Sequence, residues 1–184
     1  KILNRFPGNG LRLVILGRLT YQKGIDRVIP ILKRIKNCHL TIIGDGLDKN
    51  KLQKLILDTG VKDKINFISF SHIANSYVAA ADYLLLPSRW EGLPNVALEA
   101  LILGTPVISF KEITGLNDFI PLASEDGLTL CNDEYEMENL LNTLKPRKDY
   151  IKPMIRSNLL KEFNTPKIYA KKIEIMIKEL IIAG

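Results

Sequence analysis

Residues 11–46 read LRLVILGRLTYQKGIDRVIPILKRIKNCHLTIIGDG, and this stretch decides the fold of the chain. An apolar run at Leu11–Leu16 is followed by a helical pattern from about Ile25 to Ile35 and then by a second apolar run at His39–Ile43. Short, continuous runs of Ile, Leu and Val are typical of strands that are buried on both faces. Two such strands around a helix predict a right-handed β-α-β unit with parallel strands.

The same alternation continues along the chain. Four more apolar runs are expected to be strands, at Ile65–Phe70, Tyr83–Leu86, Pro106–Phe110 and Leu128–Cys131. Helical patterns alternate with them, near Lys49–Leu57, Asn75–Ala80, Pro94–Leu103 and Glu134–Leu144. We therefore predict a three-layer α/β domain with about six parallel strands. Residues 1–184 are expected to form this single domain, with a core of about residues 11–146. Two more helices, Ile151–Phe163 and Pro166–Ile182, would lie in a tail of about residues 148–184.

The composition is that of a globular domain with a moderate positive charge. The 184 residues include 26 Lys and Arg against 20 Asp and Glu, which gives a net charge of +6. This charge suits an anionic ligand, but the basic residues are spread out, which argues against a nucleic-acid-binding protein. Cys38 and Cys131 lie far apart without metal-ligand spacing, so we expect buried thiols in a reducing compartment. No apolar stretch reaches the roughly 18 residues of a membrane helix and no signal peptide is recognisable, so we expect a cytoplasmic location.

The loops after the strands are the candidates for function, because parallel sheets bind ligands beyond the carboxyl ends of their strands. The first loop, Gly17–Gly24, places Arg18 and Lys23 before the N-terminus of a helix. A helix N-terminus attracts anions, and the two cations together could clamp a diphosphate. Taken alone, the loop fits a solvated basic turn equally well, and the phosphate-binding pattern Gly-x4-Gly-Lys-Ser/Thr is absent.

The second loop, Gly44-Asp45-Gly46, begins like the dinucleotide-binding fingerprint Gly-x-Gly-x-x-Gly. Lys49 occupies the third glycine position, so the fingerprint is incomplete. The two glycines would allow a ligand to approach the backbone closely. A plain strand-to-helix turn accounts for the same residues.

The loop and helix after the fourth strand carry two carboxylates, Glu91 and Glu99. Gly92 permits an unusual turn and Pro94 suits the first turn of a helix, so the amides of Leu93–Asn95 are expected to point toward the strand ends. Glu99 falls among apolar neighbours, where a carboxylate requires donors such as sugar hydroxyls. Beside the cation pair, the carboxylates suit a nucleoside diphosphate that carries a sugar on each side. Without the other loops, an N-terminal charge and a surface residue are the simpler explanation.

Several motifs in a fixed order resemble a known family. They are Gly17-Arg18-Leu19, Lys23-Gly24, Gly44-Asp45-Gly46, Ala81-Asp82, Leu86-Pro87-Ser88, Glu91-Gly92-Leu93-Pro94-Asn95, Glu99-Ala100 and Gly104-Thr105-Pro106-Val107-Ile108. The chain resembles the carboxy-terminal, donor-binding domain of retaining glycosyltransferases of family 4, which have the GT-B fold. The resemblance runs from about Leu11 to Leu130 and implies a Rossmann-like domain that forms half of a GT-B enzyme.

The resemblance also implies roles for individual residues. Arg18 and Lys23 would bind the donor diphosphate and stabilise the leaving charge, and Glu91 would contact the transferred sugar. Glu99 would bind the ribose, while Leu93–Asn95 would approach sugar and phosphate through the backbone. The family normally needs no divalent metal, and the sequence holds no Asp-x-Asp metal motif, so no cofactor is expected.

The same resemblance implies that the chain belongs to a larger enzyme. It implies a hexosyltransferase that uses a nucleotide sugar, in bacterial cell-surface polysaccharide or lipopolysaccharide synthesis. In relatives an acceptor-binding domain precedes the matching region; we expect it to be missing here, so the chain alone should transfer little sugar. The Lys-rich helix Pro166–Ile182 could lie on the inner face of the cytoplasmic membrane, although packing against a domain is the simpler explanation.

Two segments depart from the family, and two other functions stay open. Ser69–Asp82 is short, which leaves the nucleobase open, and Thr114-Gly115 stands where relatives often have Gly-Gly. His72 could act as a general base in catalysis, but a position on the surface or beside the nucleobase is the simpler explanation. The alternatives are a non-catalytic nucleotide-binding module and a dinucleotide-binding oxidoreductase domain. The latter requires a full glycine fingerprint after the first strand, where Arg18 and Lys23 stand instead.

Overall fold

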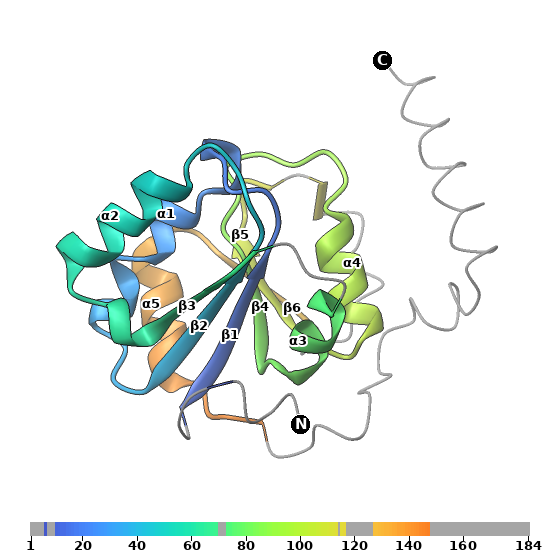
Figure 1. The fold of residues 1–184 in the computed structure, drawn as a ribbon. Helices are drawn as coiled ribbons and strands as arrows, with labels where there is room; N and C mark the ends of the chain where they lie inside the picture. Colours follow the sequence, from blue (N-terminus) through green and yellow to red (C-terminus); the bar gives the residue numbers. More distant parts are fainter. Residues whose placement is uncertain (1–5, 7–9, 70–72, 114, 117–126, 148–184) are drawn as a thin grey trace.

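The computed structural model describes residues 6, 10–69, 73–113, 115–116 and 127–147. Six parallel strands form one sheet in the order β3-β2-β1-β4-β5-β6 (Figure 1). They are β1 Leu11–Leu16, β2 Cys38–Ile43, β3 Ile65–Ile68, β4 Tyr83–Leu86, β5 Val107–Phe110 and β6 Leu128–Cys131. The predicted Rossmann-like α/β class is confirmed. The strand order reverses between β1 and β4, and such a reversal marks the ligand-binding edge of doubly wound sheets.

Helices cover both faces of this sheet, which gives the three layers (Figure 1). One face carries α1 Ile25–Val28, α2 Lys49–Thr59 and α5 Glu134–Thr143, and the other carries α3 Ala74–Ala80 and α4 Asn95–Ile102. Successive side chains of a strand point to opposite faces. In β1, Leu13 and Ile15 therefore belong to one hydrophobic core and Val14 to the other, and all three are buried.

The helix predicted for about residues 25–35 is wrong in its length. Helix α1 ends at Val28, and a separate 3₁₀ turn follows at Ile31–Lys33. Pro30 lies between the two pieces. Its ring nitrogen carries no hydrogen to donate to the carbonyl of Asp26, so the helix stops there although the apolar spacing continues.

Other boundaries differ from the predictions by one or two residues. Strand β3 ends at Ile68, and Phe70 lies outside the described residues. Helix α4 begins at Asn95, with Pro94 as the residue that precedes its first turn. The helices predicted at Ile151–Phe163 and Pro166–Ile182 also lie outside the described residues. Among the helices that are described, none is long and apolar enough to cross a membrane.

A buried ion pair lies at the edge of the sheet where the amino ends of the strands meet, opposite the predicted site. The carboxylate of Asp82 is fully buried and accepts hydrogen bonds from the backbone amide and the guanidinium of Arg12. It also accepts one from the amide of Arg147 at 2.7 Å. These bonds connect β1, β4 and the segment after α5, and they compensate the charges for their loss of water.

The two cysteines are buried and unpaired, as predicted. Burial, together with the nearby carboxylates of Glu136 and Asp133, raises the pKa of Cys131 to about 11. Burial also raises the pKa of Cys38. Both thiols are therefore core groups in their neutral form.

Candidate functional site

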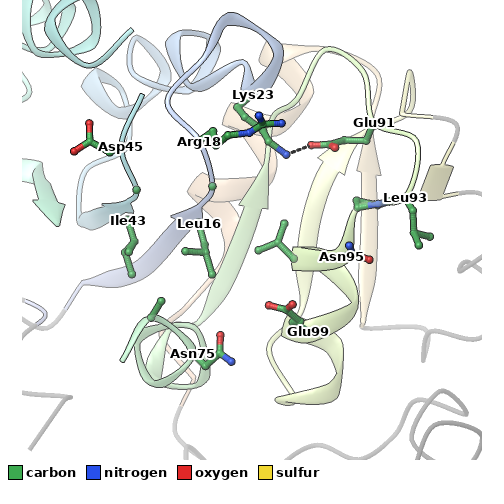
Figure 2. A pocket seen from close by; sticks show the side chains of 15 residues that line it. Leu16, Arg18, Lys23, Ile43, Asp45, Asn75, Glu91, Leu93, Asn95 and Glu99 are labelled. Atoms are coloured by element: carbon green, nitrogen blue, oxygen red, sulfur yellow. Dashed lines mark hydrogen bonds and ion pairs between the residues drawn. The ribbon is translucent and has the colours of Figure 1, made fainter. Parts of the chain in front are cut away.

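A pocket of about 720 Å³ opens at the carboxyl edge of the sheet, beside the point where the strand order reverses (Figure 2). The ends of β1 and β2, the loops after β1 and β4, and the first turns of α3 and α4 surround it. It is lined by Leu16, Gly17, Arg18, Lys23, Ile43, Gly44, Asp45, Ala74, Asn75, Glu91, Leu93, Pro94, Asn95, Val96 and Glu99. The fold thus brings together all the predicted site residues except Gly46 and Gly92.

Backbone forms one wall of this pocket. Gly44 has a φ of 149°, and a Cβ atom there would lie 1.9 Å from the carbonyl oxygen of Gly17. The amide of Gly17 donates to the carbonyl of Ile43 at 3.0 Å, and the amide of Gly44 donates to the carbonyl of Ile68 at 2.9 Å. The loops after β1 and β2 are therefore packed main chain against main chain, and a ligand on this side meets peptide groups.

Gly46 and Gly92 support the pocket from outside its lining. A Cβ atom on Gly46 would lie 2.4 Å from the carbonyl oxygen of Leu19, so the glycine allows two loops to pack closely. Gly92 does not have a positive φ, so the unusual turn predicted for it is wrong. The close approach occurs instead at Gly115, where a Cβ atom would lie 1.8 Å from the carbonyl oxygen of Gly92.

An ion pair joins the loops after β1 and β4 (Figure 2). The Nζ atom of Lys23 lies 2.5 Å from Oε1 of Glu91, and the buried hydroxyl of Ser88 donates to the same oxygen at 2.7 Å. The two charged side chains are only 18% and 9% exposed, so salt screens this pair less than it screens a surface pair. The other oxygen, Oε2 of Glu91, accepts no hydrogen bond from the described part of the chain.

The remaining charged residues of the pocket are more accessible. Arg18 is exposed next to Lys23, and its side chain makes no hydrogen bond or ion pair with any residue that the structure describes. Asp45 accepts a hydrogen bond from the amide of Gly46 and pairs with Lys49, and these contacts lower the pKa of Asp45. The pocket therefore offers one guanidinium that can turn toward an anion.

Two details predicted for the carboxylate loop are wrong. Glu99 lines the pocket but is exposed, because α4 turns Leu98 and Ala100 toward the core and Glu99 away from it. Water can solvate this carboxylate, so it does not require a protein or sugar donor. The amide of Asn95 donates to the carbonyl of Leu93 at 2.9 Å, so that amide is not available to a ligand as predicted.

The comparison with known families agrees with this geometry. The model of the family described as glycosyl transferases group 1 matches residues 4–144. The chain belongs to this family. This membership agrees with the resemblance to glycosyltransferases that the loop motifs carry.

Individual members of the glycosyl transferases group 1 family and solved glycosyltransferases extend the comparison. The lipopolysaccharide core biosynthesis glycosyltransferase LpsE of Rhizobium meliloti (strain 1021) is 32% identical over 105 residues, which are 57% of this chain and 31% of LpsE. The structure of WaaG, a glycosyltransferase involved in lipopolysaccharide biosynthesis, matches with a TM-score of 0.61 and 25% identity over 76% of this chain and 38% of WaaG. Anabaena Alr3699/HepE, in complex with UDP and glucose, matches with a TM-score of 0.72 and 22% identity over 92% of this chain and 49% of that chain, which shows a shared fold. The chain spans about a third of the length of the curated relatives that it matches.

Several residues of this pocket escaped the sequence analysis. Asn75, in the first turn of α3, and Val96, in the first turn of α4, both line the pocket. Ser88 appeared only as part of a motif, although its hydroxyl holds Glu91. A polar residue that opens the helix after β3 was the available signal for Asn75. His72 lies outside the described residues.

Proposed function

We propose that the pocket binds a nucleoside-diphosphate sugar, and that the domain is the donor-binding half of a retaining hexosyltransferase of family 4. One observation carries this proposal: Arg18, Lys23 and Glu91 surround a single pocket at the carboxyl edge where the strand order reverses. Two cations suit a diphosphate, and a carboxylate beside them suits sugar hydroxyls. None of these groups has to act as an acid or a base.

The diphosphate would lie between Arg18 and Lys23. Lys23 is held by Glu91 and carries a fixed positive charge, whereas the exposed Arg18 can present its planar fork to phosphate oxygens. When the bond between sugar and phosphate breaks, the leaving diphosphate gains negative charge. Lys23 is already held in place and stabilises this charge without reorganisation, and Arg18 adds its charge once it has turned toward the phosphates; this is the main catalytic contribution that we assign to the two cations.

The two carboxylates would bind the sugars on either side of the diphosphate. Oε2 of Glu91 can accept a hydrogen bond from a hydroxyl of the transferred sugar while Oε1 keeps Lys23 and Ser88. Glu99 lines the pocket from α4 and can accept hydrogen bonds from both ribose hydroxyls. A carboxylate accepts such paired bonds through its two oxygens.

The proposal also concerns the pathway, the location and a further domain of the enzyme. The names of LpsE and WaaG refer to lipopolysaccharide synthesis, which supports a role in bacterial cell-surface polysaccharide or lipopolysaccharide assembly. The complex of HepE with UDP and glucose supports a nucleotide-sugar ligand. We further propose a separate acceptor-binding domain, a cytoplasmic site that can lie at the inner membrane face, and catalysis without a divalent metal.

Calorimetric titration of the 184-residue chain with UDP-, GDP- and ADP-sugars and with NAD tests the ligand class. We expect binding of at least one nucleotide sugar, no binding of NAD and no effect of a metal chelator. Lys23→Ala should weaken donor binding by about 10- to 100-fold, because it removes a charge-assisted contact to phosphate. Glu99→Gln should weaken it by about 3- to 10-fold, because a neutral amide accepts more weakly.

Two matched variants control for nonspecific effects. Lys36→Ala removes an exposed lysine just before β2, at the opposite edge of the sheet, and Asp58→Asn removes an exposed carboxylate on α2. Both should bind the donor like the wild type. Binding of NAD without any response to a nucleotide sugar would overturn the ligand class. Unchanged donor affinity in both Lys23→Ala and Glu99→Gln would show that the site is misplaced.

The need for an acceptor-binding domain has its own test. The chain alone should release no more nucleoside diphosphate from the donor than a blank does. Donor turnover by the 184-residue chain at the rate of a two-domain glycosyltransferase would contradict this part of the proposal.

A further inference from the structure

Arg89 makes a second set of contacts between the loops that carry Lys23 and Glu91. Its Nη1 and Nη2 atoms donate to the two carboxylate oxygens of Asp26, at 2.9 and 2.6 Å. Nη1 also donates to the carbonyl of Tyr21 at 2.8 Å, and the guanidinium lies 3.9 Å from the centre of the Tyr21 ring. We call the paired Arg89 and Asp26 side chains the clasp.

The two ion pairs join the same two segments of the chain. The earlier residue of each segment pairs with the later residue of the other. Lys23 precedes Asp26 in one segment, and Arg89 precedes Glu91 in the other. Lys23 pairs with Glu91, and Asp26 pairs with Arg89. Reversing the partners would place Lys23 against Arg89 and Asp26 against Glu91, which are pairs of like charge. The charge pattern therefore selects one alignment of the two segments.

The clasp has the features of an ion pair that fixes geometry. Exposed ion pairs contribute little unless their geometry is bidentate or they belong to a network. Here the contact is bidentate, Arg89 is only 21% exposed, and its guanidinium also covers an aromatic ring. The hydrogen bond from Arg89 lowers the pKa of Asp26, as expected for a carboxylate whose charged form is stabilised by the folded protein.

Close main-chain contacts connect the clasp to the loops that line the pocket. The amide of Arg89 donates to the carbonyl of Gln22 at 2.8 Å, and the side chain of Gln22 donates to the carbonyl of Trp90 at 3.0 Å. A Cβ atom on Gly24 would lie 2.0 Å from the carbonyl oxygen of Pro87. The residues on both sides of Lys23 are therefore attached to the segment that ends in Glu91.

We propose that Arg89 and Asp26 are positioning residues of the donor site, which hold the loop after β4 against the loop after β1 and so keep Lys23 and Glu91 in contact. Neither residue lines the pocket, so they act through Lys23 and Glu91. The effect on donor binding rests on the proposed function. The contact between Lys23 and Glu91 is a property of the protein itself and can be measured without a nucleotide.

The test uses Arg89→Gln in the full chain and two measurements. The first is the hydrogen-exchange rate of the Lys23 ammonium group, followed by NMR without nucleotide; we expect it to rise by at least about threefold as the ion pair loosens. The second is the dissociation constant of the nucleotide sugar, which should rise by about fivefold or more. Arg34→Gln is the matched control, because it removes an arginine from an ion pair with Glu138 far from the pocket. It should change neither quantity.

A second variant tests the same ion pair from its other side. Asp26→Asn removes the carboxylate partner of Arg89, so it should also speed exchange at Lys23 and weaken donor binding. Arg89→Lys keeps the charge but loses the planar fork, so it should give intermediate values; it replaces Arg89→Gln if that variant does not fold.

The outcomes distinguish this inference from the proposed function. Wild-type exchange at Lys23 in folded Arg89→Gln would overturn the positioning role, and so would wild-type exchange in folded Asp26→Asn. A wild-type chain that binds no nucleotide sugar would overturn the proposed function, whereas the exchange rates would still decide whether the clasp holds Lys23.

Discussion

The Nζ atom of Lys23 and the Oε1 atom of Glu91 lie 2.5 Å apart, although 68 positions separate the two residues in the chain. Separate motifs predicted Lys23 as a phosphate ligand and Glu91 as a sugar ligand. Their contact means that each side chain sets the electrostatic environment of the other. A change to one of them should therefore also change how the other interacts with a bound ligand.

Glu91→Gln should shift the preference of the pocket from the sugar to the phosphates. Without the carboxylate, Lys23 has no anionic partner and is free to interact more strongly with phosphate, while the sugar loses a charged acceptor. We expect the bare nucleoside diphosphate to bind about threefold more tightly and the advantage of the nucleotide sugar over it to shrink. Calorimetry with the two ligands measures this ratio. Glu112→Gln, a change in the half-exposed partner of Arg27, is the control. An equal loss of affinity for both ligands would contradict the prediction.

Gly44→Ala should destabilise the domain. The glycine has a φ of 149°, and the added methyl group would meet the carbonyl oxygen of Gly17 at 1.9 Å. Because the obstacle is main chain, we expect a loss of roughly 1–3 kcal/mol in the free energy of unfolding, measured with urea. Gly92→Ala has free space and no positive φ, so it should stay within about 0.5 kcal/mol of the wild type. Equal stability of the two variants would show that the loops can separate at no cost.

The clasp should make stability depend on pH in the acid range. Arg89 lowers the pKa of Asp26 below its usual 3.8. A carboxylate whose pKa is lowered by folding stabilises the protein above its unfolded pKa, and this contribution is lost as the pH falls through the folded pKa. Asp26→Asn should therefore be less stable than the wild type at neutral pH, by less than about 1 kcal/mol because the side chain is 40% exposed. Urea unfolding at a series of pH values should show this difference shrinking as the pH falls below 3.8. A difference that grows toward acid pH would contradict the assigned ion pair.

The two cysteines should resist thiol reagents in the folded protein. Cys38 and Cys131 are both buried, and the pKa of Cys131 is raised to about 11, so little reactive thiolate forms near neutral pH. A chromogenic disulfide reagent should therefore label both thiols only after unfolding in denaturant. The denatured chain serves as the control for full labelling. Rapid labelling of one thiol in the native protein would show that its part of the core opens readily.

The fold was largely predictable, because the strands of a sheet that is buried on both faces appear in the sequence as continuous apolar runs. All six strands coincide with such runs. The helix after β1 was predicted too long because apolar residues keep their helical spacing through Pro30, whereas the backbone hydrogen bond is lost there. Apolar spacing records which side chains face the core, and it does not record whether every amide can donate.

The pocket was predictable only in part, for a related reason. Motif residues such as Arg18 and Asp45 line it, because loops after parallel strands gather at one edge. The contact of Arg89 with Asp26 joins residues that are far apart in the chain, and no local pattern reports such a pair. Glu99 was expected among apolar neighbours because its neighbours in sequence are apolar. Its exposure depends on which face of α4 meets the sheet, and only the folded helix shows this.

The glycine wall of the pocket has a consequence for how the domain can diversify. A wall made of peptide groups at Gly17 and Gly44 cannot be reshaped by exchanging side chains, because even a methyl group at Gly44 collides with the main chain. On the α3 and α4 side, by contrast, the side chains of Asn75 and Val96 line the pocket and can be exchanged. A mutational library aimed at altered donor choice should leave the glycines untouched and concentrate its diversity at those two positions. The main-chain wall therefore sets the shape of one side of the pocket, whereas side chains such as Asn75 and Val96 can change the other.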